Sequence, residues 1–109
     1  MIREIEQQRL ALADLCRRYR VRQLQLFGSA ATAGFVPETS DLDFIAEFAD
    51  TRSADYADRY LDFAEALERL FNRPVDVLTQ RAIRNPYFRT QVESTAQVVY
   101  EDHSQKTFA

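Results

Sequence analysis

Three aspartates in this 109-residue chain have types and spacings that could support phosphate chemistry. Asp41 and Asp43 lie two positions apart in an otherwise apolar segment, residues 40–48, so in a strand both carboxylates would project from one face. Asp76, between two valines, supplies a third carboxylate from another apolar run. Half-buried anions side by side need a cation, and a divalent metal is the simplest one. Three acids on adjacent strands suit one or two Mg²⁺ ions that stabilise the attacking and leaving oxygens of phosphoryl or nucleotidyl transfer.

A glycine-serine pair, Gly28 and Ser29, follows the apolar run at residues 21–27. A glycine without Cβ lets the backbone approach a polyphosphate closely. The N–H groups at a following helix start, together with the serine hydroxyl, can bind the phosphate oxygens. The pair is therefore a candidate nucleotide-binding turn.

Each of these features also has a plainer interpretation. An Asp-x-Asp spacing occurs by chance in many chains. A glycine-serine pair after a strand is usually only a turn, and Asp76 could be an edge-strand acid that faces water. The features are more specific in combination than singly. The combination is a strand that ends in Gly-Ser, then Ser-Asp-Leu-Asp within a second strand, then Val-Asp-Val within a third.

The apolar periodicity predicts helices and strands that would position these residues. Helices are expected over residues 2–19, from an N-cap at Ser53 to about residues 72–74, and from an N-cap at Asn85 with Pro86 in the first turn. Strands are expected over residues 21–27, 40–48, 75–78 and 97–100. Residues 29–33 could form a short helical turn, residues 34–40 a loop, and residues 103–109 a polar tail. The length and this mixture predict one α/β (α+β) domain over residues 1–109.

Composition limits the possible partners and locations. The net charge of −3 argues against a large positive field for long nucleic acid, although a short or already bound end is compatible with it. Cys16 is the only cysteine, which indicates a reducing compartment, and we expect the cytoplasm. No apolar run approaches the roughly 18 residues of a membrane span, so no membrane association is expected.

Arginines after the first helix form a basic cluster that could face a nucleotide or an acidic partner. Cations near a helix C-terminus are favourable in any case, so we favour a structural role for the cluster. Two further arginines after the third strand are the basic residues best placed by sequence to approach the acids, and a solvated helix start explains them equally well. The first group is Arg17, Arg18, Arg20 and Arg22, and the second is Arg81 and Arg84.

Three motifs, LFGS, SDLDF and PVDVLT, together resemble the minimal nucleotidyltransferases of the DNA polymerase β superfamily. These small bacterial proteins occur as antitoxin partners of HEPN-domain RNase toxins. The segments RAIRNPYF and VVYED resemble the C-terminal part of the same group, so the similarity extends over nearly the whole chain.

The resemblance implies a fold, an activity and a partner. The fold would be a short mixed sheet of three to four strands with helices packed on it. The activity would be Mg²⁺-dependent transfer of a nucleoside monophosphate, AMP from ATP, to a hydroxyl, and the acceptor can be a tyrosine of the HEPN toxin. By position, Gly28 and Ser29 would bind the triphosphate, Asp41 and Asp43 would bind two metal ions, and Asp76 would complete the metal site.

Two other functions stay open. Many relatives carry arginine where this chain has Ala30 or Thr32, and the loss of those cations would suit an antitoxin that neutralises its toxin by binding alone. Transfer to an RNA end or to a small-molecule hydroxyl is the other alternative.

Overall fold

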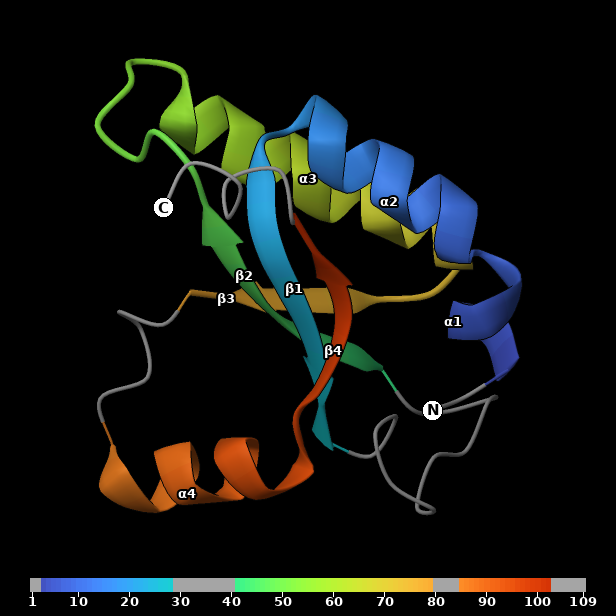
Figure 1. Ribbon diagram of the computed structural model, residues 1–109, viewed down its shortest axis with the longest axis vertical. Coiled ribbons are helices and arrows are strands. Elements are labelled where there is room, and N and C mark those ends of the chain that lie inside the picture. Colours follow the sequence, from blue (N-terminus) through green and yellow to red (C-terminus); the bar gives the residue numbers. More distant parts are fainter. Residues whose placement is uncertain (1–2, 29–40, 80–84, 103–109) are drawn as a thin grey trace.

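A four-stranded mixed sheet organises the computed structural model, which describes residues 3–28, 41–79 and 85–102. The strands are β1 (Val21–Phe27), β2 (Leu42–Phe48), β3 (Val75–Leu78) and β4 (Gln97–Glu101), and their order across the sheet is β3-β2-β1-β4 (Figure 1). β1 runs antiparallel to both β2 and β4, whereas β2 and β3 are parallel. The predicted short mixed sheet with packed helices is therefore confirmed.

The chain's first helical segment is divided into α1 (Arg3–Gln7) and α2 (Arg9–Arg18). The single helix expected over residues 2–19 is wrong in this respect. Gln8 lies between the two helices with φ −104° and ψ 17°, and its side chain makes no capping hydrogen bond. Hydrogen bonds from Gln8 N–H to Glu4 O (3.2 Å) and from Leu12 N–H to Gln8 O (2.8 Å) bridge the interruption, so the apolar stripe continues across it. Leu12 and Cys16 are fully buried, as expected for core positions.

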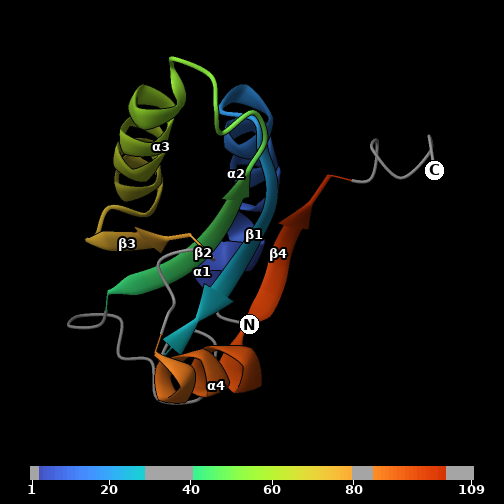
Figure 2. The same cartoon turned by 90° about the vertical axis from the view of Figure 1, so that its left-hand side faces the viewer.

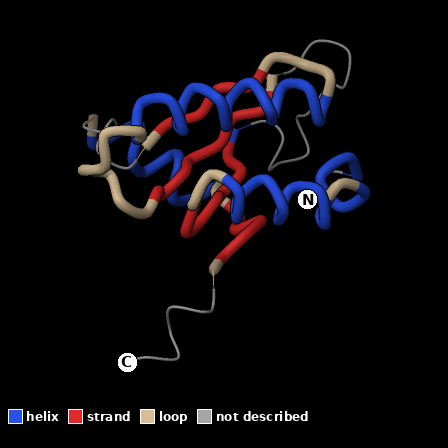
Figure 3. The backbone as a smooth tube through the Cα atoms, turned by 90° about the horizontal axis from the view of Figure 1, so that it is seen from above, coloured by secondary structure: helices blue, strands red, loops and turns tan. Residues whose placement is uncertain are grey.

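α3 (Tyr56–Phe71) starts later than predicted. Ser53 is not its N-cap, because the residue before the helix is Asp55 and the Ser53 hydroxyl donates instead to Asp55 Oδ1. The predicted end is confirmed, since Asn72 closes the helix in the left-handed conformation with φ 53°. α2 and α3 lie side by side over the sheet, as Figures 1 and 3 show.

α4 (Pro86–Thr95) begins as the sequence predicts. The N–H of Tyr87 donates to Asn85 Oδ1 at 2.9 Å, and Pro86 occupies the first helical position. α4 lies away from the layer formed by α2 and α3, near the end of β1 (Figure 2).

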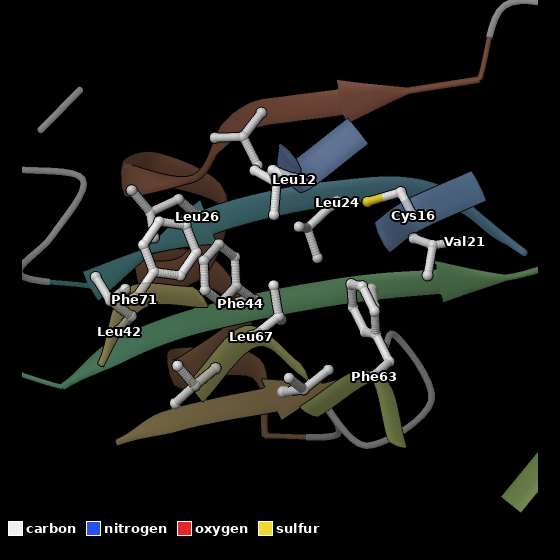
Figure 4. Packing of buried hydrophobic residues seen from close by; sticks show 14 of the residues in the cluster. Leu12, Cys16, Val21, Leu24, Leu26, Leu42, Phe44, Phe63, Leu67 and Phe71 are labelled. Carbon is white, nitrogen blue, oxygen red and sulfur yellow. The ribbon is translucent and has the colours of Figure 1, made fainter. Parts of the chain in front are cut away.

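The two faces of the sheet carry different cores, because successive side chains of a strand alternate between faces. The larger core joins one face to α1, α2 and α3, and Figure 4 shows its members in contact. It includes Leu24, Leu26, Leu42, Phe44, Phe63 and Leu67, all fully buried. A smaller cluster of Phe27, Ile45 and Val92, with Leu78 and Ala96 against it, joins the other face to α4.

The aromatic residues of α3 pack on the sheet, as their spacing predicts. Phe48 of β2 is surrounded by the rings of Tyr56, Tyr60 and Phe63, with centroids 5.6 to 5.8 Å away. Among the described residues, no helix is both long and apolar enough to cross a membrane.

Candidate active site

Asp43 and Asp76 lie directly beside each other on neighbouring strands. They are register partners in the parallel pair of β2 and β3, and Phe27 at the end of β1 is the partner of Asp43 on its other side. Both carboxylates are on the face of the sheet opposite α1, α2 and α3, because Leu42 and Phe44 point into the larger core. Asp43 is half-buried, whereas Asp76 is exposed.

Asp41 has a different setting from Asp43. It lies just before β2, which begins at Leu42, and it is exposed. The strand predicted over residues 40–48 is therefore shorter at its start than expected. Asp41 contributes charge to the site but is not held in the hydrogen-bonded ladder as Asp43 and Asp76 are.

The pKa of Asp43 is raised by burial and by the neighbouring negative charges. Burial is the largest influence, followed by the charges of Asp76 and Asp41 and a side-chain hydrogen bond with Asp76, and together they raise the pKa of Asp43 from 3.8 to about 6. A carboxyl group that resists ionisation beside two other acids is stabilised in its charged form when a cation is present.

Gly28 is required by two separate constraints. Its φ of +74° is in the left-handed region, which disfavours any residue with a side chain. A Cβ at this position would also lie 2.8 Å from Asp43 Oδ2, closer than such contacts allow. The absence of a side chain at Gly28 thus gives the Asp43 carboxylate its space, in addition to any role toward phosphate. Ser29, the other half of the predicted turn, lies outside the described residues, as do Ala30 and Thr32.

The carboxylate oxygens of Asp43 and Asp76 are donors that suit a hard cation. Within residues 3–28, 41–79 and 85–102, no three His, Cys, Asp or Glu side chains are grouped so as to hold a metal ion by themselves. Two adjacent carboxylates do come together, and Mg²⁺ is usually bound by one or two carboxylates with the remaining positions filled by water and substrate phosphates. Asp43 and Asp76 therefore fit a magnesium site that the nucleotide itself would complete.

Three residues near these acids were not singled out by the sequence patterns as part of the site. Tyr60 and Glu68 of α3 bind the backbone of β3, and Thr95 at the end of α4 accepts a hydrogen bond from Gly28 N–H at 3.4 Å. The spacing of Tyr60 predicts only a core position, and no local signal identifies the partners of Glu68 or Thr95. Their contacts depend on how the helices lie against the sheet.

Two arginines of the basic cluster, Arg17 and Arg20, pair with acids of the fold. Arg20 Nη1 binds Asp50 Oδ2 at 3.1 Å and Arg20 Nη2 binds Asp55 Oδ2 at 2.9 Å, while Arg17 pairs with Asp14 at 2.8 Å. A hollow of about 430 Å³ lies beside these side chains, and Asp50 and Asp102 line it along with the arginines. The structural interpretation is therefore supported for Arg17 and Arg20. Arg81, Arg84 and His103 lie outside the described residues.

Cys16 has the character of a core residue. It is fully buried, and burial raises the pKa of its thiol to about 12. A thiol in that state is not a nucleophile at neutral pH.

A short mixed sheet, with aspartates on adjacent strands and a left-handed glycine against one of them, is the arrangement of an enzyme that transfers nucleotidyl groups. Residues 9–99 match the family described as "Nucleotidyltransferase domain". The chain belongs to this family, and the prediction of a minimal nucleotidyltransferase is confirmed.

Similar proteins agree on this class. The chain is 36% identical over 76 residues to a Methanocaldococcus jannaschii protein provisionally named protein adenylyltransferase MJ1379, covering 70% of this chain and 74% of the relative. A solved structure described provisionally as a minimal nucleotidyltransferase superimposes with a TM-score of 0.67 at 32% identity, covering 84% of this chain and 89% of that one. A complex of a tri-AMPylated Shewanella oneidensis HEPN toxin with its MNT antitoxin gives 0.61 at 17% identity, covering 95% and 78%. The last similarity concerns the fold alone.

Proposed function

We propose that this chain is a Mg²⁺-dependent nucleotidyltransferase that moves AMP from ATP to a hydroxyl of a partner protein in the cytoplasm. We further propose that the partner is a HEPN-type toxin and that the chain is its antitoxin. The observation that carries the proposal is the alignment of Asp43 with Asp76 on adjacent strands, with Gly28 placed against the Asp43 carboxylate.

Each candidate residue has a role that follows from its position. Asp43 and Asp76 hold the metal, with Asp41 as an additional acid at the edge of the site. Mg²⁺ bound there would neutralise the phosphate charge and stabilise the oxygens that attack and leave. Gly28, followed by Ser29, lets the backbone approach the triphosphate. Asp76, the more exposed of the paired carboxylates, accepts the proton of the acceptor hydroxyl. The oxygen of that hydroxyl then forms the bond to the α-phosphorus of ATP, and pyrophosphate leaves.

The partner assignment draws on the chain's relatives and on its size. Within residues 3–28, 41–79 and 85–102 the chain forms little beyond the sheet and its helices, so an acceptor protein would bring its own surface to the acids. Relatives carry the name protein adenylyltransferase, and solved structures of similar fold include complexes of toxin with antitoxin. These similarities support a protein hydroxyl over the alternative acceptors, an RNA end and a small molecule.

The proposal is tested with α-labelled ATP, Mg²⁺ and the HEPN protein encoded beside this one. We expect label on the HEPN protein, and we expect Asp43→Asn or Asp76→Asn to reduce labelling at least about a hundredfold, because each removes a charge that the metal needs. Asp41→Asn should have a smaller effect because Asp41 is exposed and outside the ladder.

Glu47→Gln is the matched control. Glu47 lies on the same strand and the same face as Asp43 but four residues further along, where it is exposed, so its replacement should leave labelling unchanged. Labelling that survives Asp43→Asn would refute the metal assignment, and the lack of any HEPN reading frame beside the gene would refute the antitoxin role.

A second candidate function is an antitoxin that neutralises by binding alone. It is favoured by the lack of a basic residue at Ala30 and at Thr32, where a cation could otherwise bind the phosphates. In that case the Asp43→Asn protein would neutralise the toxin as well as the parent does, with no pyrophosphate released.

A further inference from the structure

The outer side of β3 is bound by side chains rather than by another strand. β3 is an edge strand of four residues, and its parallel partner β2 lies on one side only. On the other side, the hydroxyl of Tyr60 donates to the carbonyl oxygen of Val77, and the N–H of Val75 donates to Glu68 Oε2 at 3.3 Å. Both side chains come from α3 and hold the strand on either side of Asp76.

These two hydrogen bonds satisfy groups that would otherwise be costly. Val75 and Val77 are 8% and 6% exposed, and a buried backbone N–H or C=O without a partner costs about 1–3 kcal/mol. Residues two apart in a strand present their backbone groups to the same side, so both bonds lie along the outer edge. Two side chains of α3, which itself packs on the face of the sheet, thus bind backbone groups that a further strand would otherwise use.

The register of β3 determines whether the two site carboxylates meet. A slip of one residue would move each Cα by about 3.3 Å and turn Asp76 toward the larger core, where Val75 and Val77 now pack. The four-residue ladder to β2 is short, which leaves register weakly fixed by backbone pairing alone. The α3 contacts supply the missing restraint at the two positions that flank Asp76.

We infer that Tyr60 and Glu68 are positioning residues, which hold Asp76 beside Asp43 by fixing the backbone of β3. Burial is the main cause that raises the pKa of Tyr60, followed by Tyr56 and by the charge of Asp76. The importance of this restraint for catalysis rests on the proposed function, whereas its effect on metal binding and on the strand does not require turnover.

The test compares Tyr60→Phe, Glu68→Met, which removes the acceptor of the Val75 N–H, and the double variant with the parent by direct titration with Mn²⁺. We expect each single variant to bind Mn²⁺ about tenfold more weakly, in the range found when outer residues that orient metal ligands are removed. The Mg²⁺ concentration for half-maximal transfer should rise by the same factor while the KM for ATP at saturating Mg²⁺ stays unchanged. High Mg²⁺ should restore the rate of Tyr60→Phe but not that of Asp76→Asn.

Two control variants separate positioning from general loss of structure. Tyr56→Phe removes a hydroxyl one helical turn earlier, on a ring that also packs on Phe48, and Glu65→Met removes an exposed carboxylate that pairs with Arg69 at 3.6 Å. Both should bind Mn²⁺ as the parent does. Amide exchange at residues 76–78 should accelerate in the Tyr60 and Glu68 variants only.

The outcomes distinguish this inference from the proposed function. A parent that binds Mn²⁺, with Tyr60→Phe binding equally well, overturns the positioning role and leaves the function intact. A parent that binds no Mn²⁺ refutes the metal-dependent function, and unchanged exchange at residues 76–78 in the variants would then overturn the restraint itself.

Discussion

Asp43 is the acid with the closest contacts in the site, and these contacts determine its electrostatics. It contacts Asp76 across the parallel pair and approaches Gly28 so closely that a Cβ there would lie 2.8 Å from its carboxylate. Its position between β1 and β3 explains the burial that is the main cause of its raised pKa. A metal ion would reverse this penalty, because the ionised carboxylate would then have a partner.

The raised pKa of Asp43 predicts how the stability of the metal-free protein depends on pH. Because the folded pKa is about 6 and the reference value is 3.8, the protonated form is favoured by folding, so stability is fully present below 3.8 and is lost as the pH rises through 6. After a discount for the part of the side chain in contact with water, the loss is about 1–2 kcal/mol. Asp43→Asn should lack this loss.

Urea unfolding in EDTA, at about pH 4.5 and about pH 7, measures the difference between the two proteins. The free energy of unfolding of the parent, relative to Asp43→Asn, should fall between those pH values, and Mg²⁺ should reduce the fall. Parallel pH profiles would contradict the crowding of charge described for this site.

At the residue scale, the sequence predicted which acids share a face but not how they differ. The two-residue spacing of Asp41 and Asp43 places both on one side of a strand, which is a local property. The start of β2 at Leu42 and the burial of Asp43 depend on β1 and β3, which are distant in sequence. Tyr60 was predicted as a core residue, and its hydroxyl's partner could not be predicted before the position of β3 was known.

At the scale of elements, Arg59 joins the ends of three segments. Its guanidinium is buried, and the residue is 6% exposed. It donates to the carbonyl oxygens of Tyr19 (3.1 Å) and Asp50 (2.7 Å) and to Asp55 Oδ1 (3.2 Å). These bonds tie the end of α2 and the turn after β2 to the first turn of α3.

The joined ends contain two residues in strained backbone conformations. Arg20 has φ 58° and Asp50 has φ 51°, and neither is glycine. Each such residue costs about 1–2 kcal/mol. Their mutual ion pair at 3.1 Å and the hydrogen bond from Ala49 N–H to Arg20 O at 2.8 Å hold both bends in place.

Arg59→Met is expected to lower the free energy of unfolding by about 2–3 kcal/mol, because it leaves two carbonyls without their charged donor. Arg69→Met is the matched control on the same helix. The Arg69 side chain is 77% exposed, and its ion pair with Glu65 is long, at 3.6 Å. Its loss should therefore lower the free energy of unfolding by less than about 0.5 kcal/mol. Equal costs measured by urea unfolding would show that the buried network contributes nothing.

The start of α3 shows why element boundaries were only partly predictable. Ser53 has a favoured N-cap side chain, and the helix-period residues begin soon after it. The Ser53 hydroxyl and the two arginines, Arg59 and Arg20, instead converge on Asp55 and keep the pKa of Asp55 below its ordinary value. Of these contacts, only the one from Arg20 joins residues far apart in sequence, and it could not be predicted from the local pattern. The helix itself begins at Tyr56. Asn72 and Asn85 were predicted correctly because their effects are local.

At the scale of the whole molecule, the two faces of the sheet are unequally supported. The large core under α1, α2 and α3 contains most of the fully buried side chains, whereas α4 is held by the small cluster around Val92. Small clusters open at lower free energy than the main core. α4 should therefore open locally before the rest of the fold.

Val92→Ala should raise the amide exchange rate of α4 about tenfold, equivalent to about 1.4 kcal/mol, while α3 exchanges at its original rate. Gly28 should exchange faster too, because its N–H donates to Thr95 at the end of α4. Val99→Ala is the control. Val99 is similarly buried, at 6% against 5% for Val92, but belongs to the larger core, so its truncation should accelerate exchange in α3 and β1.

If Val92→Ala accelerates amide exchange equally throughout the protein, the sheet and α4 unfold as one unit.

The strands and most helices of this architecture follow from local periodicity. The order β3-β2-β1-β4 does not, because it depends on which strands pair across the sheet.

The hydrogen bonds from two α3 side chains to the edge of β3 have a consequence for self-association. An open strand edge is a template for edge-to-edge pairing with other chains and hence for aggregation. At β3, the Val75 N–H and the Val77 carbonyl already have partners from Glu68 and Tyr60, so an incoming strand cannot pair with these two groups without breaking those hydrogen bonds. Addition of a strand from another molecule is therefore directed to the opposite margin, beside β4.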